Sequence, residues 1–417
     1  MPSLPRDPAF DSTLSLLFSD GYTFIRKRCR RYGTDVFETR LALQRAICMT
    51  GEEAARMFYE PGRFTRKQAM PLTAFLLLQD KGSVSEQDGE VHRHRKEMFM
   101  SLMTPAQIQQ LTERFAEEWH AAIERWSSHD EVVLHHEVQE LLCRAVCAWA
   151  GVPLTQAAAR QRTREFAAMI DGAGTIGPRN WWGLLLRMRT ERWARRIVKQ
   201  IRSGKLDGPE ECAAHVIAGH RDHEGNLLDV KTAAVELLNV LRPTVAVARF
   251  VTFAALALHQ HPTYRRRLRA DDEDDLERFV QEVRRFYPFF PFIGGRAKEA
   301  FNWRGYRFAE GTWVLLDLYG TDHDERRWEE PQAFRPERFE TWDESAFSFI
   351  PQGGGDHFAG HRCAGEWITI ALMKRAVRLL TKAMQYDVPE QDLHVPLSRM
   401  PTIPKSRFVI SNVKRAQ

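Results

Sequence analysis

Several features that would assign this chain to a familiar class are scarce in its sequence. Its 417 residues contain only six cysteines, and none of them form a CxxC pair. A disulfide framework is therefore not indicated, and a reducing cytoplasm is the expected compartment. Sixty basic and fifty-five acidic residues leave a net charge of +5, too weak an imbalance to predict nucleic-acid binding. The N-terminus has no basic segment followed by an apolar core, so we expect neither a targeting sequence nor a membrane anchor there.

Long apolar runs without charge are also lacking. The best candidate for a membrane span covers residues 233–258, but it contains Glu236, Asn239, Arg242 and Arg249. Each charge at the centre of a bilayer costs roughly 2.5 to 3.5 kcal/mol. The segment is therefore predicted to be a buried core helix.

Apolar residues at spacings of three and four dominate what is present. In residues 105–127, Ile108, Leu111, Phe115 and Trp119 form one amphipathic stripe. Similar helical patterns cover residues 136–151, 159–171, 186–203, 231–260, 273–287 and 365–385. Strand-like segments are short and cover residues 36–39, 307–314 and 407–411. We predict a mainly α fold with small β-sheets, organised as a single domain over residues 1–417, with an extended segment rich in proline and glycine at 288–362.

One cysteine lies in a glycine-rich loop. Residues 349–366 read FIPQGGGDHFAGHRCAGE and contain Cys363. Their glycines let the backbone adopt positive φ and approach a flat cofactor without Cβ clashes. A helical pattern starts at Glu366, so amide N–H groups and the positive end of a helix favour a thiolate, which can ligate iron. The alternative is a buried cysteine beside a phosphate-binding type of loop.

Two other patterns in the sequence are less specific for a function. Cys143 and Cys147 lie four apart on one helical face, which could indicate a metal pair but is more typical of small packing residues. Glu282 and Arg285 share a helical face and can form an ion pair. Arg338, in the run FRPERF at 334–339, could extend that pair into a three-membered network that fixes the loop before Cys363.

Together these motifs resemble the cytochrome P-450 superfamily over essentially the whole chain. The loop GGGDHFAGHRCAGE, preceded by Gln352, resembles that of the peroxide-using fatty-acid hydroxylases, although Ala364 stands where that family usually has proline. Further matches are VCAWAGVPL at 146–154, RRFYPFFP at 284–291, LDLYG at 316–320 and YDVPEQDL at 386–393. The resemblance implies haem b with Cys363 as the thiolate ligand. It also implies that haem propionates are bound by His92, the strongest candidate, and by Lys96, Arg66 and His361, with surface solvation as the alternative for any one of them.

The central helix departs from ordinary monooxygenases. Where those carry an acid–alcohol pair that delivers protons to oxygen, this chain has Arg242 and Pro243. Pro243 lacks an N–H and is predicted to kink the helix. A buried guanidinium requires a partner. We expect this partner to be a substrate carboxylate that acts as the missing acid–base group, and the alternative is an internal salt bridge to Glu236. By resemblance the substrates are a fatty acid and hydrogen peroxide, and no redox partner is required.

The sequence gives fewer indications of which carbon of the substrate is hydroxylated. Ser85 stands where the family pattern places glutamine or histidine near the reactive carbons, unless Gln79 is the true counterpart. Phe289 and Phe290 match members that hydroxylate mainly at Cα, so we expect 2-hydroxy acids. β-Hydroxylation or decarboxylation to alkenes is the first alternative. A haem-binding sensor without catalysis and a conventional monooxygenase that needs electron-transfer partners are the others.

Overall fold

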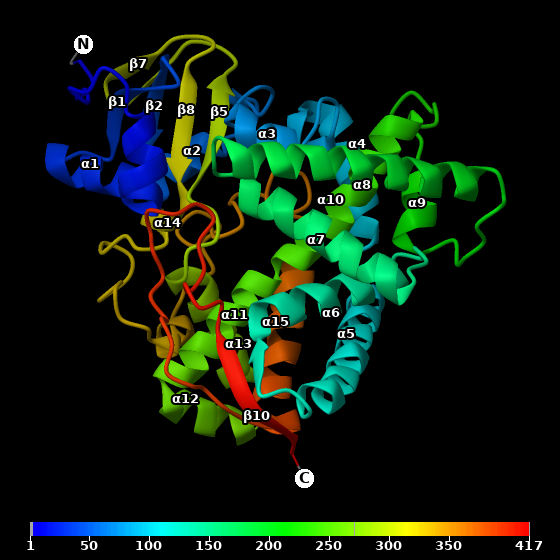
Figure 1. The fold of residues 1–417 in the computed structure, drawn as a ribbon. Helices are drawn as coiled ribbons and strands as arrows, with labels where there is room; N and C mark the ends of the chain where they lie inside the picture. Colours follow the sequence, from blue (N-terminus) through cyan, green and yellow to red (C-terminus); the bar gives the residue numbers. More distant parts are fainter. Residues whose placement is uncertain (1–2, 271, 417) are drawn as a thin grey trace.

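The computed structural model describes residues 3–270 and 272–416 (Figure 1). Helices form most of it, and a smaller part near the N-terminus is built on strands. The helices are α1 (Phe24–Tyr32), α2 (Glu52–Phe58), α3 (Leu72–Leu78), α4 (Gly89–Ser101), α5 (Pro105–Trp126), α6 (Leu134–Trp149), α7 (Gln156–Gly172), α8 (Pro178–Arg202), α9 (Ala213–Gly219), α10 (Val230–Ala246), α11 (Ala248–Gln260), α12 (Pro262–Arg267), α13 (Glu273–Phe286), α14 (Leu318–Thr321) and α15 (Glu366–Arg378).

The strands form three small sheets. They are β1 (Val36–Leu41), β2 (Gln44–Met49), β3 (Phe64–Thr65), β4 (Glu131–Val133), β5 (Phe292–Ala297), β6 (Phe301–Trp303), β7 (Tyr306–Phe308), β8 (Trp313–Asp317), β9 (Met384–Asp387) and β10 (Val409–Arg415). The largest sheet has the order β1-β2-β8-β5-β3, in which only β2 and β8 run parallel. The others are β4-β10-β9 and the hairpin β6-β7. The predicted mainly α fold with small sheets is confirmed.

The predicted elements differ from the observed ones chiefly at their ends. The helix expected at 186–203 begins at Pro178, because proline at the first position of α8 suits a helix start. The strand expected at 307–314 is two strands, β7 and β8, since the chain turns at Gly311, whose φ is 73°. The pattern at 365–385 ends in strand β9 rather than in helix.

The core helix is α10 followed by α11. By length and composition Val230–Gln260 could cross a membrane, but 89% of its most apolar window is buried inside the protein, as predicted. Pro243 lies within α10 and does not end it; the interruption falls at Val247, whose amide donates to the Thr244 carbonyl at 3.2 Å. The helix therefore continues for three residues past Pro243, and the kink expected at this proline stays a prediction.

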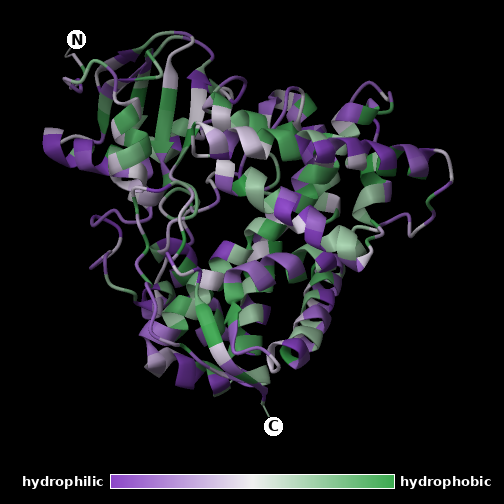
Figure 2. Ribbon diagram, in the orientation of Figure 1, coloured by the Kyte–Doolittle hydropathy of each residue, from purple (hydrophilic) through white to green (hydrophobic). Residues whose placement is uncertain are grey.

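Hydropathy follows this arrangement. In Figure 2 strand β8, inside the largest sheet, is green, whereas α1 on the outside is largely purple. All five residues of β8 are buried. The strand leads into α14 and then into the long segment that carries Cys363. A rigid strand therefore anchors the start of that segment.

Candidate active site

Cys363 lies two residues before Gly365, the N-cap of α15. Its amide donates to the Gln352 carbonyl at 3.1 Å, and the Gln352 Nε2 lies 3.7 Å from its sulfur. Burial raises the pKa of the Cys363 thiol and Glu366 adds to this effect, whereas the Gly365 amide, Lys96 and Arg284 lower it. A bound metal cation would shift the balance toward the thiolate.

Glycines shape the loop before the sulfur. Gly353 and Gly355 have φ of 91° and 76°, in the region that side chains disfavour. A Cβ at Gly354 would lie 2.5 Å from the Ala346 carbonyl oxygen, so the loop packs closely there. A Cβ at Gly365 would lie 4.0 Å from the Cys363 sulfur, and Cys363 is half-buried, whereas the other five cysteines are buried.

Buried ion pairs hold this loop against α13. Glu366 accepts hydrogen bonds from Arg284 and from Arg362, the latter at 2.6 Å from its Nε. Burial opposes ionisation of Glu366, but Arg284, His357 and Arg362 together lower its pKa well below the usual value. Arg284 directly precedes Arg285, the arginine predicted to pair with Glu282. Unlike Arg285, it binds the ligand loop, through Glu366.

The predicted network of Glu282, Arg285 and Arg338 is confirmed. Arg285 donates two hydrogen bonds to Glu282, at 2.7 and 2.8 Å, and Arg338 Nε lies 3.2 Å from the same carboxylate. Arg285 also donates to the carbonyls of Asp322 and Pro331. In turn the Asp322 carboxylate accepts from the Ile350 amide at 2.7 Å, so the network fixes the chain directly before the glycines.

The four residues expected to bind the haem propionates come together. His92 and Lys96 lie on one face of α4; the His92 ring lies 3.9 Å from the ring of His361, and Lys96 donates to the carbonyls of Gly360 and Arg362. Burial lowers the pKa of His92 to about 3, of His361 to about 4 and of Lys96 to about 8. Arg66 donates to the Gly294 carbonyl at 2.7 Å.

This arrangement fits a haem. Among residues 3–270 and 272–416, no carboxylate lies within ion-pair distance of Arg66 or Lys96, although both are buried. The hydroxyl of Tyr59, 3.3 Å from where a Gly353 Cβ would be, is buried without a hydrogen-bond partner in the same range. Cations without an acidic partner, near a half-buried cysteine, match a cofactor with two carboxylates and a thiolate-ligated iron. Cys363 would hold its iron, and Arg66, His92, Lys96 and His361 its propionates.

Arg242 is 4% exposed and has no acidic partner in the part of the chain that the structure describes. It donates to the carbonyls of Leu77 and Leu78, at the end of α3, and to the Asn239 Oδ1 at 3.1 Å. Of the five N–H groups of a guanidinium, the Nε–H and one on Nη1 have no acceptor among these residues. Burial, with nearby Arg187, lowers the pKa of Arg242 to about 9, so it is a cation at neutral pH.

The alternative of an Arg242–Glu236 salt bridge is wrong. Glu236 pairs instead with Arg95 of α4, whose Nη1 lies at 2.8 Å, and it also accepts from the Val84 amide at 2.8 Å. Asn239 stands between the two, with its Nδ2 donating to Glu236 at 2.9 Å. Neither Arg95 nor Asn239 was predicted from the sequence to belong to the site. The spacing of 236, 239 and 242, three apart on one helix, is the signal that could have identified Asn239.

The residues expected to set the position of hydroxylation are more dispersed. Gln79 follows Leu78, whose carbonyl Arg242 binds, whereas Ser85 is bonded to Ser83 at 2.9 Å. Phe289 stacks on Phe250 of α11 with centroids 4.2 Å apart, and Phe290, which is 38% exposed, packs edge-on against it. Phe289 and Phe290 contact each other, but the described contacts join neither of them to Ser85 or Gln79.

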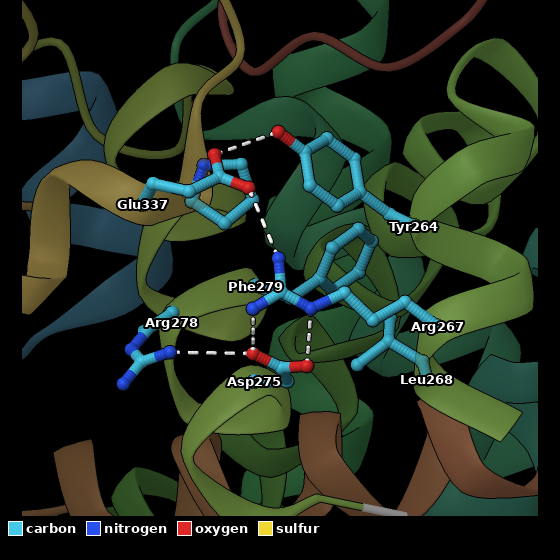
Figure 3. Close-up of a pocket in the computed structure, with 8 residues that line it drawn as sticks. Tyr264, Arg267, Leu268, Asp275, Arg278, Phe279 and Glu337 are labelled. Atoms are coloured by element: carbon cyan, nitrogen blue, oxygen red, sulfur yellow. Dashed lines mark hydrogen bonds and ion pairs between the residues drawn. The ribbon is translucent and has the colours of Figure 1, made fainter. Parts of the chain in front are cut away.

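A cavity elsewhere has no connection with this site. It lies between α12, α13 and the segment at 336–337, and its volume of about 10 Å³ has room for about one water (Figure 3). Arg267, Asp275, Tyr264 and Glu337 close it through mutual hydrogen bonds. Cys143 and Cys147, the other cysteine pair, are buried in the core, as the packing interpretation predicts.

Comparisons with known proteins agree with the geometry. Residues 275–409 match the family model described as Cytochrome P450. The putative cytochrome P450 120 of Synechocystis is 25% identical, over 96% of this chain and 95% of that protein. The structure of cytochrome P450SP alpha (CYP152B1) in complex with (R)-ibuprophen is 50% identical, with a TM-score of 0.94 over 97% of this chain and 99% of that one.

Two further solved structures are similar over the full chain. Cytochrome P450EX alpha (CYP152N1) with myristic acid is 44% identical, with a TM-score of 0.96, and covers 100% of both chains. A variant of cytochrome P450 OleT in complex with arachidonic acid is 38% identical, with a TM-score of 0.96 over 100% of this chain and 99% of that one.

Proposed function

The chain belongs to the cytochrome P450 family and is a haem-thiolate oxidoreductase with a cysteine-ligated haem, and from this premise we propose that it is a fatty-acid peroxygenase. It uses hydrogen peroxide to convert long-chain fatty acids mainly to 2-hydroxy acids, as a cytoplasmic enzyme that needs no redox partner. Cys363 is the ligand of its haem.

The observation that carries the proposal is Arg242. Its guanidinium is buried, and among the described residues it donates only to neutral acceptors. The protein therefore leaves its positive charge uncompensated, and a substrate carboxylate can pair with it. Its two unused N–H groups can donate to a carboxylate while the bonds to the Leu77 and Leu78 carbonyls are kept. Myristic and arachidonic acids, the molecules named with two similar structures, both carry such a group.

Each residue then has a defined part. The haem supplies oxygen transfer from peroxide to carbon. Arg242 binds the substrate carboxylate and orients the fatty acid so that its Cα and Cβ are the carbons closest to the reacting centre. The carboxylate holds and returns the proton that an acid–alcohol pair handles in other members, which is general acid–base catalysis by the substrate itself. Pro243 stands where that pair would need its alcohol, and so contributes no proton.

The position of oxidation depends on the shape of the pocket. Phe290 is fixed by Phe289, which itself stacks on α11. We propose that its ring presses the chain so that Cα is the reacting carbon. Ser85, short and without a basic ring, adds no group that would promote decarboxylation.

The test is product analysis by mass spectrometry after incubation of the holo-protein with peroxide and saturated fatty acids of several lengths. The 2-hydroxy acid should dominate. A majority of 3-hydroxy acid or terminal alkene would favour the corresponding alternative within the same class. No peroxide consumption above background with any fatty acid would favour a haem-binding sensor, and turnover only with a reductase system would favour a conventional monooxygenase.

A further inference from the structure

A continuous chain of polar groups, all buried except the half-buried Asn239, connects α4 with Arg242. Its members are Arg95, Glu236, Asn239 and Arg242, joined by contacts of 2.8, 2.9 and 3.1 Å. Glu236 is fully buried, and Arg95 and Arg242 are each 4% exposed. Two cations therefore flank one anion, with a neutral amide on one side of it.

The anion in this chain is a potential competitor for Arg242. Glu236 lies only one amide group from the guanidinium, in a region where charges are poorly screened by water. An uncompensated carboxylate there would attract Arg242 and repel a substrate carboxylate approaching it. Burial raises the pKa of Glu236, and Arg95, Asn239 and the Val84 amide oppose that rise.

Arg95 compensates this charge by a direct contact with the Glu236 Oε1, the oxygen that also accepts from the Val84 amide. The second oxygen, Oε2, accepts from the Nδ2 of Asn239. Because Nδ2 is used in this way, the amide oxygen of Asn239 faces Arg242. An amide satisfies an acceptor on one side and a donor on the other without adding charge.

We propose that Arg95 and Asn239 are positioning residues that keep Arg242 available for the substrate carboxylate, Arg95 by neutralising Glu236 and Asn239 by separating Glu236 from Arg242. The inference rests on the proposed function, in which Arg242 binds that carboxylate. It explains why Glu236, the buried acid nearest to Arg242 in the sequence, pairs with Arg95 and not with Arg242. It also connects substrate binding with α4, the helix that carries His92 and Lys96.

The test measures, by isothermal titration calorimetry on haem-loaded protein, the dissociation constants of a long-chain fatty acid and of the alcohol of equal length. Arg95→Gln should weaken binding of the acid by roughly tenfold or more, since it exposes Arg242 and the ligand to an unpaired buried charge. Binding of the alcohol should change by less than about threefold. Arg95→Lys retains the charge and should bind the acid nearly as the wild type does, and Arg95→Gln/Glu236→Gln should recover most of the lost affinity.

Asn239→Asp provides an independent arm in case Arg95→Gln does not fold. It adds a carboxylate beside Arg242 with almost no change in shape and should also weaken the acid selectively. Equal losses for acid and alcohol, or a double variant as weak as Arg95→Gln, would show a merely structural role and overturn the inference. Unchanged acid binding in Arg95→Gln beside a loss in Arg242→Ala would overturn this inference alone. Unchanged acid binding in Arg242→Ala would overturn the proposed function and this inference together.

Discussion

Replacing Arg242 with alanine should abolish most of the preference for a carboxylate. The guanidinium is buried and, within residues 3–270 and 272–416, donates hydrogen bonds only to two carbonyls and one amide oxygen, so the ion pair it forms with a substrate is desolvated. Loss of one partner of such a pair costs about 3 to 5 kcal/mol. This corresponds to roughly two to four orders of magnitude in affinity or in kcat/KM.

Part of that cost is not electrostatic, because Arg242 also holds the end of α3 through Leu77 and Leu78. The alcohol of equal chain length separates the two contributions, since it makes the same apolar contacts without a charge. We expect Arg242→Ala to lower the affinity of the acid by the full amount and that of the alcohol by about tenfold or less. Arg242→Lys keeps the charge but not the fork of donors, and should fall between the wild type and alanine.

Calorimetric titration of acid and alcohol with wild type and variant gives the four dissociation constants required. Far-ultraviolet circular dichroism and the haem-to-protein absorbance ratio confirm that the variants are folded and loaded. If alanine weakens acid and alcohol equally, Arg242 is structural and the reasoning is refuted. Retention of acid binding within a factor of a few would place the carboxylate elsewhere.

Three other predictions concern the ligand, the fold and the product. Cys363→Ala should abolish the thiolate-type spectrum of the reduced carbonyl complex, whereas Cys143→Ala should retain it; an ordinary histidine-type spectrum in the wild type would contradict the assignment. Burial raises the pKa of Asp317 to about 7, so the folded state holds this proton more tightly than the unfolded chain, and its contribution to the free energy of unfolding is lost as pH rises from about 4 through about 7. Asp317→Asn should therefore raise the melting temperature relative to wild type more at pH 8 than at pH 5, and an equal difference at both would count against this. Phe290→Gly should move hydroxylation toward Cβ, and Ser85→His should raise the alkene fraction, both measured by mass spectrometry; an unchanged product ratio in both variants would remove these residues from control of the reaction.

Much of the architecture follows from local pattern. The stripe of Leu111, Phe115 and Trp119 predicted the buried face of α5, and all three side chains are buried in the core. Apolar periodicity depends only on residues close together in the sequence, so it can be recognised without knowledge of the fold. Short strands such as β2 and β5 were missed, because their pairing with β8 is a long-range contact that no local pattern encodes.

The candidate site divides in the same way. The glycine loop around Cys363, the spacing of Glu282 and Arg285, and the position of Arg242 in an apolar helix were all present in the sequence. Which charges meet was decided only by packing. Glu236 could pair with Arg242 on its own helix or with an arginine from another helix. Because α4 packs against α10 at this point, its partner is Arg95 of α4. The sequence by itself determined that a buried cation exists at 242. Only the tertiary structure determined that this cation has no acidic partner among the residues described, because partner choice depends on which helices come together.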